Sequence, residues 1–222
     1  MIYITGDTHG DIDFEKLDVL REYGVNSSDF LIICGDAGIC WNENILQYFL
    51  KLYNSIGCTV IFVDGNHENF DMLNNMPLVE YCGALMHQID KRIFHVLRGE
   101  IMTLEGKTFL CLGGAHSIDK AYRTIHVSWW PEEDINNHDI DNAVYNLAKY
   151  NNKVDYVITH CCDTPTVQKA FNFKRDKSTD CLNFIDKVVD YQHWFFGHYH
   201  FDRQVSNKKT CLYKTIICLN SK

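Results

Sequence analysis

Short apolar runs recur along the whole chain, and they constrain its fold more than any other feature of the sequence. Each run is four to six residues long, and several are apolar at every position instead of alternating with polar residues. Continuous apolar runs of this length are typical of strands covered on both faces. The runs that we interpret as strands are Ile2 to Thr5, Phe30 to Cys34, Thr59 to Val63, Phe109 to Leu112, Val154 to Thr159 and His193 to Phe196.

Helical stretches alternate with these runs, which favours an α/β fold. The helix candidates are residues 11–23, 43–55, 139–150 and 179–190. The third follows Pro-Glu-Glu-Asp (131–134), a proline and three acids suited to a helix start. Residues 92–113 instead predict a meander of strands with turns at Arg98-Gly99 and Glu105-Gly106-Lys107, and residues 203–219 predict a hairpin around Asn207-Lys208-Lys209. The sheets are therefore not expected to be all parallel.

Length and composition predict one domain over residues 1–222. The chain has 222 residues, of which 46% are hydrophobic, enough to bury one core. Its longest apolar runs fall far short of the ~20 residues that span a bilayer, so no membrane partner is expected. The N-terminus reads MIYITGD, without a basic segment or an apolar leader, and the ten cysteines often stand beside apolar residues. We expect buried thiols in a reducing cytoplasm.

The net charge of the chain limits which classes of molecule it can bind. A formal net charge of −8 argues against non-specific nucleic-acid binding, which draws its affinity from basic surface. It does not exclude a phosphate substrate, because metal ions can supply positive charge locally. The oligomeric state stays open.

Polar clusters follow five of the apolar runs directly. They read YITGDTHGD, IICGDAG, VDGNHEN, VITHCC and FFGHYH. In open α/β sheets, ligands bind at the carboxyl ends of the strands. Asp7 and His9 are two residues apart, as are His198 and His200, so on extended backbone each pair projects to one side. Five such clusters in order indicate one shared site.

These blocks resemble those of the calcineurin-like metallophosphoesterases, which carry Asp-x-His, Gly-Asp, Gly-Asn-His-Glu or Asp, a lone His, and Gly-His-x-His. They span residues 5 to 200. The resemblance implies a two-sheet mixed β sandwich flanked by helices, in four αββα layers, with a two-metal centre at one edge. It implies that His67 faces the substrate and that the metals are held by Asp7, His9, Asp36 and His200, and by Asn66, His160 and His198, with Asp36 shared.

The donor types agree with that implication. Imidazole, carboxylate and amide oxygen without thiolate suit Mn, Fe, Zn, Co or Ni better than an all-oxygen Mg or Ca site, and we expect Mn to support activity. Two divalent ions, two carboxylates and a bridging hydroxide leave a formal charge of about +1, which attracts a phosphate ester and favours in-line attack. His67 as general acid would contribute roughly 10²–10⁴-fold. Glu68 is expected to support the site or start a helix.

Two alternatives to a small-molecule phosphoesterase are considered. A metal-poor relative of this fold could be a scaffold that binds proteins, although no ligand is missing here. The first and third blocks also resemble those of Ser/Thr protein phosphatases, which continue the second block as Asp-Arg-Gly. Here Ile39 and Cys40 stand at the Asp and Arg places, so the arginine that holds phosphate is absent. This favours a small-molecule or nucleotide phosphoester over a phosphoprotein, and leaves monoester and diester open.

Other segments could replace that arginine. The stretch GGAHSIDKAYR (113–123) offers Arg123 for bidentate phosphate contacts, with Lys120 and His116 as further candidates, or it could be a solvent-facing turn. Trp129 or Trp130 could stack a nucleobase, but tryptophans in such a segment more often pack a loop against the core. A basic stretch could edge the site or be plain solvated surface; it comprises Lys169, Lys174, Arg175 and Lys177. Cys161 and Cys162 are expected to be buried thiols.

Overall fold

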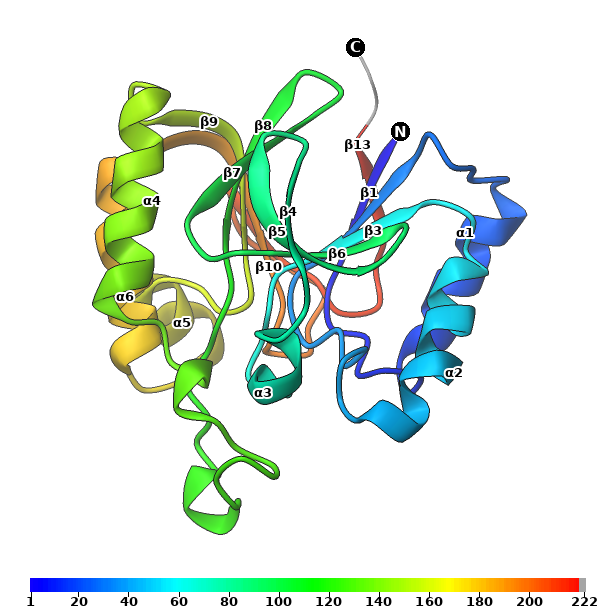
Figure 1. The fold of residues 1–222 in the computed structure, drawn as a ribbon. Coiled ribbons are helices and arrows are strands. Elements are labelled where there is room, and N and C mark those ends of the chain that lie inside the picture. The colour runs from blue at the N-terminus through cyan, green and yellow to red at the C-terminus, as the bar shows by residue number, and fades with distance from the viewer. Residues whose placement is uncertain (220–222) are drawn as a thin grey trace.

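The computed structural model describes residues 1–219, which form two mixed sheets packed face to face with helices on both outer sides (Figure 1). In the first sheet the strand order is β13-β1-β2-β3-β6-β5-β4, and in the second it is β11-β12-β10-β9-β8-β7. Strands β1, β2, β3 and β6 run parallel, as do β8, β9, β10 and β12. The predicted four-layer αββα arrangement is confirmed.

The first sheet contains β1 (Ile2–Thr5), β2 (Phe30–Ile33), β3 (Thr59–Phe62), β4 (Leu78–Tyr81), β5 (Ala84–Asp90), β6 (Ile93–Val96) and β13 (Ile217–Leu219). The second contains β7 (Glu100–Leu104), β8 (Lys107–Leu112), β9 (Lys153–Thr159), β10 (Asp190–Phe196), β11 (Arg203–Ser206) and β12 (Lys209–Cys211). All six predicted strands are present.

The helices divide between the two outer faces. On the right of Figure 1, α1 (Asp18–Glu22) and α2 (Glu43–Asn54) cover the first sheet, and on the left α4 (Asn137–Lys149), α5 (Thr164–Phe171) and α6 (Lys177–Val188) cover the second. The short α3 (Phe70–Leu73) follows β3 near the sheet edge. Between the sheets lies a core of residues such as Ile4, Ile32, Phe109, Ile158 and Phe195, all almost completely buried. This apolar layer explains why the central strands carry no polar alternation.

Three sequence predictions need correction. The predicted helix over 11–23 begins as a 3-10 turn, Phe14–Leu17, and becomes α-helical only over α1. The acids before the third helix form a separate 3-10 turn, Pro131–Glu133, and Asn136 caps α4 by accepting from the backbone N–H of Asp139. Helix α5 was not predicted, although Asp163 caps it and a proline opens it.

The predicted meander is divided between the sheets. Strand β6 pairs with β3 and β5 in the first sheet, whereas β7 and β8 form a hairpin in the second. The chain changes sheets at Leu97–Gly99, where Gly99 has φ +83° and a Cβ would lie 2.5 Å from the backbone N of Ala143 in α4. The terminal segment divides likewise: β11 and β12 form the predicted hairpin, and β13 joins the first sheet.

Two further observations concern the chain as a whole. Seven of the ten cysteines are buried, as predicted, whereas Cys82 and Cys181 are partly exposed and Cys218 is exposed. No disulfide joins the described residues. Among residues 1–219, no helix combines the length and the apolar character needed to cross a bilayer.

Gly99→Ala tests how tightly the sheet crossing packs against α4. We expect the free energy of unfolding to fall by about 2–5 kcal/mol, because a positive φ and overpacking are both unfavourable. Gly106→Ala is the matched control: its φ is +74°, but nothing lies within 4 Å of its Cβ position, so it should lose only about 1–2 kcal/mol. Urea denaturation of both variants measures the difference, and equal losses would contradict close packing at Gly99.

Candidate metal centre and cleft

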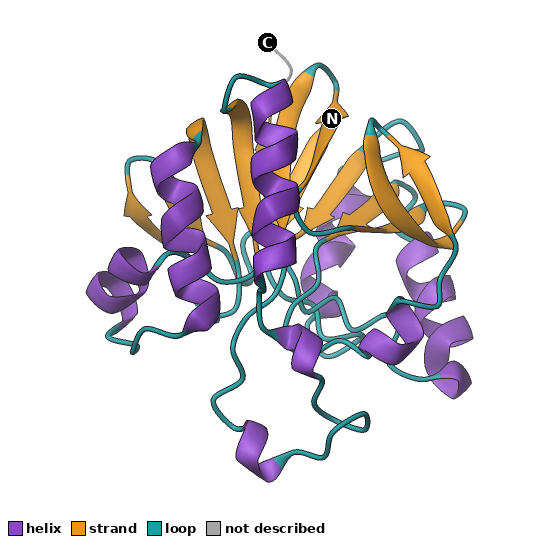
Figure 2. Cartoon of the chain, turned by 60° about the vertical axis from the view of Figure 1, so that its left-hand side comes forward, coloured by secondary structure: helices purple, strands orange, loops and turns teal. Residues whose placement is uncertain are grey.

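The predicted ligands converge where the strands of both sheets end. The loops after β1, β2 and β3 carry Asp7, Asp36 and Asn66, and those after β9 and β10 carry His160, His198 and His200. Because β1, β2 and β3 are parallel, as are β9 and β10, each set of loops leaves one end of its sheet. Figure 2 shows the loops gathered below the strand ends. Segments from both sheets thus meet at one edge.

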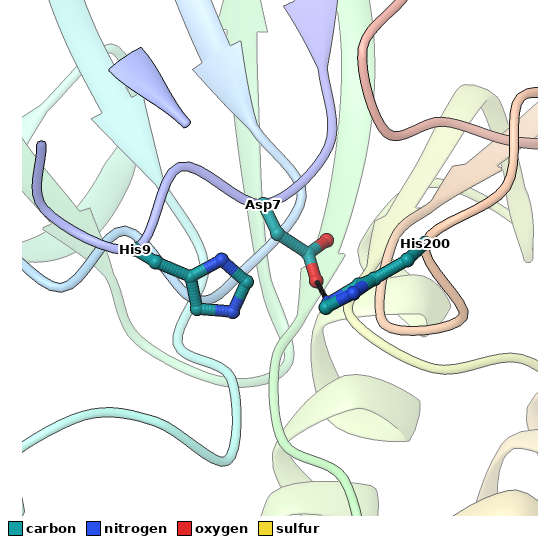
Figure 3. A group of neighbouring side chains, drawn as sticks. All are labelled: Asp7, His9 and His200. Atoms are coloured by element: carbon teal, nitrogen blue, oxygen red, sulfur yellow. Dashed lines mark ion pairs between the residues drawn. The ribbon is translucent and has the colours of Figure 1, made fainter. Parts of the chain in front are cut away.

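One group of possible metal ligands consists of Asp7, His9 and His200, drawn in Figure 3. Their donor atoms lie within 4.8 Å of one another, and Nε2 of His200 is 3.1 Å from Oδ2 of Asp7. The ring of His9 is oriented from its other side, since its Nδ1 lies 2.8 Å from Oδ2 of Asp13. Asp13 also accepts a hydrogen bond from the hydroxyl of Tyr213 at 2.7 Å. A carboxylate behind a histidine is a common support for a metal ligand.

A second group consists of Asp7, Asp36 and His160. Oδ2 of Asp36 lies 3.2 Å from Nε2 of His160 and 3.4 Å from Nε2 of His9, so this carboxylate lies between the two groups. Nδ1 of His160 donates to the carbonyl of Cys34 at 2.8 Å, which directs Nε2 towards Asp36 and towards Oδ1 of Asn66, 3.2 Å away. Three electron-rich atoms meeting in this way require a proton or a cation between them.

The pKa values of Asp36, His160 and His198 reflect how closely carboxylates and imidazoles approach one another here. Burial raises the pKa of Asp36, but His160 and His9 more than offset this and hold it well below its usual range. Burial lowers the pKa of His160, yet Asp36 raises it to about 10. For His198, whose ring lies edge-on to that of His160, burial and the charge of His160 lower the pKa to about 3. The His198 imidazole is therefore neutral and able to act as a ligand.

Two structural details fit a bound cation. Oδ2 of Asp7 is buried and accepts no hydrogen bond of good geometry from the described residues, and its neighbour at 3.1 Å, Nε2 of His200, is itself a predicted ligand. Four of the seven predicted ligand positions have positive φ angles without being glycine: His9 (44°), Asp36 (49°), His198 (68°) and His200 (54°). Backbone strain of this kind is retained where the surroundings demand one geometry. The residues present thus suit a metal centre.

The glycines of the motifs have a steric reason. A Cβ on Gly65 would collide with the carboxylate of Asp36, and one on Gly197 would collide with that of Asp7. Each glycine therefore lets one loop approach an aspartate of a neighbouring loop. Glu68 supports the same arrangement, since its buried carboxylate accepts the backbone N–H of Ala37 at 2.8 Å. Its contacts are those of a supporting residue, as expected, and burial raises its pKa to about 8.

His67 lies beside this centre. Its backbone N–H donates to Oδ1 of Asp36 at 2.7 Å, and its Nδ1 lies 2.9 Å from Nη2 of Arg123. A guanidinium has no acceptor, so Nδ1 must accept and the ring proton lies on Nε2. Burial lowers the pKa of His67, and the charge of Arg123 adds to this effect against the opposing charge of Asp36.

Arg123 belongs to a hydrogen-bonded network that the sequence did not predict. Its Nη1 donates to Oγ of Ser117 at 2.8 Å and lies 3.3 Å from Oε2 of Glu133. The Ser117 hydroxyl donates to Glu133 and accepts from Nδ2 of Asn66 at 3.1 Å. The last contact turns Oδ1 of Asn66 towards His160. Glu133 stands within the Pro-Glu-Glu-Asp segment, outside every ligand motif. The sequence therefore offered no sign that this acid would take part in the network.

A cleft of about 810 Å³ opens beside the centre. His67, His116, Ser117 and Asp119 are among its lining residues. Neither Lys120 nor Arg123 is among them; Nζ of Lys120 lies over the ring of Trp129, 5.9 Å from the centroid. Ile39 and Cys40 are fully buried in the core beneath the first sheet, so the loop after β2 supplies no cation to the cleft.

The remaining segments divide between surface and core. Lys174 and Arg175 of the basic stretch line the cleft, whereas Lys169 and Lys177 do not. Trp130 is buried, and its Nε1 donates to Asp71 at 2.8 Å, so it packs the loop as tryptophans of this kind usually do. Cys161 and Cys162 are buried thiols that donate to Gly114 and Asp163.

Solved structures align with most of this chain. The protein TT1561 of Thermus thermophilus aligns with a TM-score of 0.53 and 13% identity, covering 96% of this chain and 87% of that chain. The phosphopantetheinyl hydrolase PptH of Mycobacterium tuberculosis aligns with a TM-score of 0.45, 13% identity and the same coverage. No curated protein matches the chain significantly. At this identity the first likeness is one of fold.

The sequence itself carries the family assignment. The model of calcineurin-like phosphoesterases matches residues 1–202, a range that includes every predicted ligand and both sheets up to β10. The resemblance drawn from the five motif blocks is thereby confirmed. The chain belongs to the calcineurin-like phosphoesterase family.

Proposed function

We propose that this protein is a phosphoester hydrolase that depends on two metal ions bound where its sheets meet. Asp7, His9, Asp36 and His200 would hold one ion, and Asn66, His160 and His198 would hold the other, with Asp36 shared. The observation that carries this proposal is the position of the buried Asp36 carboxylate, whose Oδ2 lies within 3.4 Å of both His9 and His160. One ring comes from each proposed ligand set, so this oxygen is suited to bridge them.

The metals and the chain contribute differently. When bound, two divalent ions such as Mn²⁺ would lower the pKa of a shared water and offset charge on the phosphate. The chain orients the donors through Asp13 behind His9, the Cys34 carbonyl behind His160 and Ser117 behind Asn66. Such supporting hydrogen bonds keep each ligand in place before substrate arrives.

His67 and Arg123 act on the substrate in this proposal. Nε2–H of His67 donates to the departing oxygen, stabilising the negative charge that develops as the ester bond breaks. Arg123 offers a planar guanidinium beside this group and takes the place of the arginine missing after β2. Glu133 and Ser117 hold it there, and Glu133 is buried.

The proposed substrate is a small-molecule phosphoester, monoester or diester. Ile39 and Cys40 are buried where protein phosphatases carry the Asp-Arg pair, which weighs against a phosphoprotein. A cleft of about 810 Å³ also matches a small molecule in size.

Asp36→Asn tests the bridging assignment while preserving the side-chain shape. We expect metal content to fall from about two ions per chain to below one. Mn²⁺-supported hydrolysis of p-nitrophenyl phosphate and its bis ester should fall more than about 100-fold, since even outer-shell partners of ligands contribute about 10–100-fold. Elemental analysis and steady-state assays measure both. His193→Gln, a histidine of β10 that contacts Thr210, is the control; full metal content in Asp36→Asn would refute the bridge.

His67→Asn tests donation to the leaving group. The variant should retain its metals but lose roughly 10²–10⁴-fold in turnover with poor leaving groups. The loss should shrink for good leaving groups, because their departing oxygens need less stabilisation. A series of aryl phosphates of rising phenol pKa measures the trend, and a uniform loss would assign His67 to substrate positioning instead.

Arg123→Ala tests the phosphate contact. Hydrogen bonds to charged groups contribute about 1.5–3 kcal/mol, so kcat/KM should fall about 10- to 100-fold. Lys120→Ala, three residues earlier in the same segment, should lose much less, because its ammonium lies over Trp129, whereas the Arg123 guanidinium lies beside His67. Similar losses in both variants would indicate that the segment as a whole, and not the guanidinium, matters.

A further inference from the structure

The cleft continues beyond the proposed metal centre between two walls. One wall contains residues 116–119 and the other residues 172–176, while Tyr199 lies between His198 and His200 among the lining residues. The proposed reaction involves only the lining residues near His67 and the proposed metal ligands. Residues 116–119, 172–176 and Tyr199 form the remaining, outer part of the cleft. The outer part of the cleft therefore has no role in breaking the ester bond, and its chemistry describes the rest of the substrate.

The outer part exposes apolar side chains to the cleft. Ile118 is 83% exposed on one wall, and Phe173 is 44% exposed on the other. Tyr199 is buried, with its ring 5.6 Å from that of Phe173 and stacked at 4.5 Å on Phe171. A partly exposed aromatic ring that packs against a buried aromatic neighbour suits a flat apolar group. Isolated exposed apolar residues need no explanation, but these line the same cleft.

The wall that carries Phe173 is also basic. Four cations lie within residues 169–177 of a chain whose net charge is −8. Arg175 pairs with Asp180, but Lys174 makes no ion pair with any described residue and lines the cleft. Three acids also line it: Asp36 belongs to the proposed metal centre, Asp176 accepts from the N–H of Thr179 and caps α6, and Asp119 lies 3.6 Å from Arg123. Lys174 is thus available to a second anion.

We propose that the cleft binds a nucleotide carrying a second phosphate. One phosphate would lie at the metal centre, the base against Phe173, and the second phosphate at Lys174. This inference rests on the proposed function for the first phosphate. It adds a substrate class, defined by a flat base and a second anionic group, and two residues that select it.

Three probes separate these contributions: ribose 5-phosphate, adenosine 5′-monophosphate and adenosine 3′,5′-bisphosphate. They are tested with excess Mn²⁺ as inhibitors of p-nitrophenyl ester hydrolysis, or by calorimetry with the Mn²⁺-loaded protein if neither ester is hydrolysed. We expect the base to improve affinity about tenfold, as stacking on an aromatic ring does. The second phosphate should improve it about fivefold further through a charge-assisted contact.

The variants assign each step to its residue. Phe173→Ala should abolish the gain from the base, and Lys174→Glu should abolish the gain from the second phosphate. Lys91→Glu is the matched charge reversal: Lys91 is exposed in the turn before β6, and β6 runs parallel to β3, so the turn lies at the sheet edge away from the centre. It should retain both gains and normal ester hydrolysis.

The outcomes distinguish this inference from the function on which it rests. Equal affinity for the three probes, or stepwise gains that neither variant alters, would overturn the nucleotide assignment even if the p-nitrophenyl esters are hydrolysed. Absence of ester hydrolysis with Mn²⁺ would overturn the proposed hydrolase, while stepwise gains measured by calorimetry would still support a nucleotide site.

Discussion

Two buried carboxylates, those of Asp7 and Asp36, impose the main constraint on this structure. Both are almost fully inaccessible to solvent, and a buried charge is tolerated only when it is paired or bound to a metal. Backbone N–H groups of His198 and His67 donate to them, and histidines face their remaining oxygens. Nε2 of His200 lies 3.1 Å from Oδ2 of Asp7, but this oxygen accepts no hydrogen bond of good geometry from the described chain. The strained loops and the collision-avoiding glycines follow from placing these two groups together.

The fold brings the two carboxylates together by joining two sheets at one edge, and side-chain contacts stabilise the loops that meet there. Arg98 is the main brace: its guanidinium pairs with Asp64, directly before the Gly-Asn-His-Glu block, and with Asp139 in α4. It also donates to the carbonyls of residues 132 and 134. A single side chain thereby connects the loop after β3 with the segment that carries Glu133. Through Glu133 and Ser117, this connection extends to Arg123 and to the amide of Asn66.

The parts of this arrangement that are local in the sequence were predictable from it. The strands and the ligand motifs could be predicted because each apolar run and its polar end lie within about ten residues. The division of β6 and β7 between sheets could not, because periodicity reveals the face of a strand and not its partner. The braces were missed for a related reason: Arg98 and Asp64 are 34 residues apart, and Arg123 and His67 are 56 apart. Such pairs become visible only when the chain is folded.

The absent Asp-Arg pair is best understood through the same network. Because Ile39 and Cys40 stand in their places, this part of the loop after β2 packs into the core, where both side chains are completely buried. In the proposed function the cation beside the reacting group comes instead from Arg123, within the segment 113–135 that follows β8 and projects below the strand ends (Figure 1). Because Nη2 of Arg123 lies 2.9 Å from Nδ1 of His67, the residue proposed to bind phosphate and the residue proposed to meet the leaving group hold each other in place. In this proposal, phosphate binding and stabilisation of the leaving group therefore both depend on the packing of one loop.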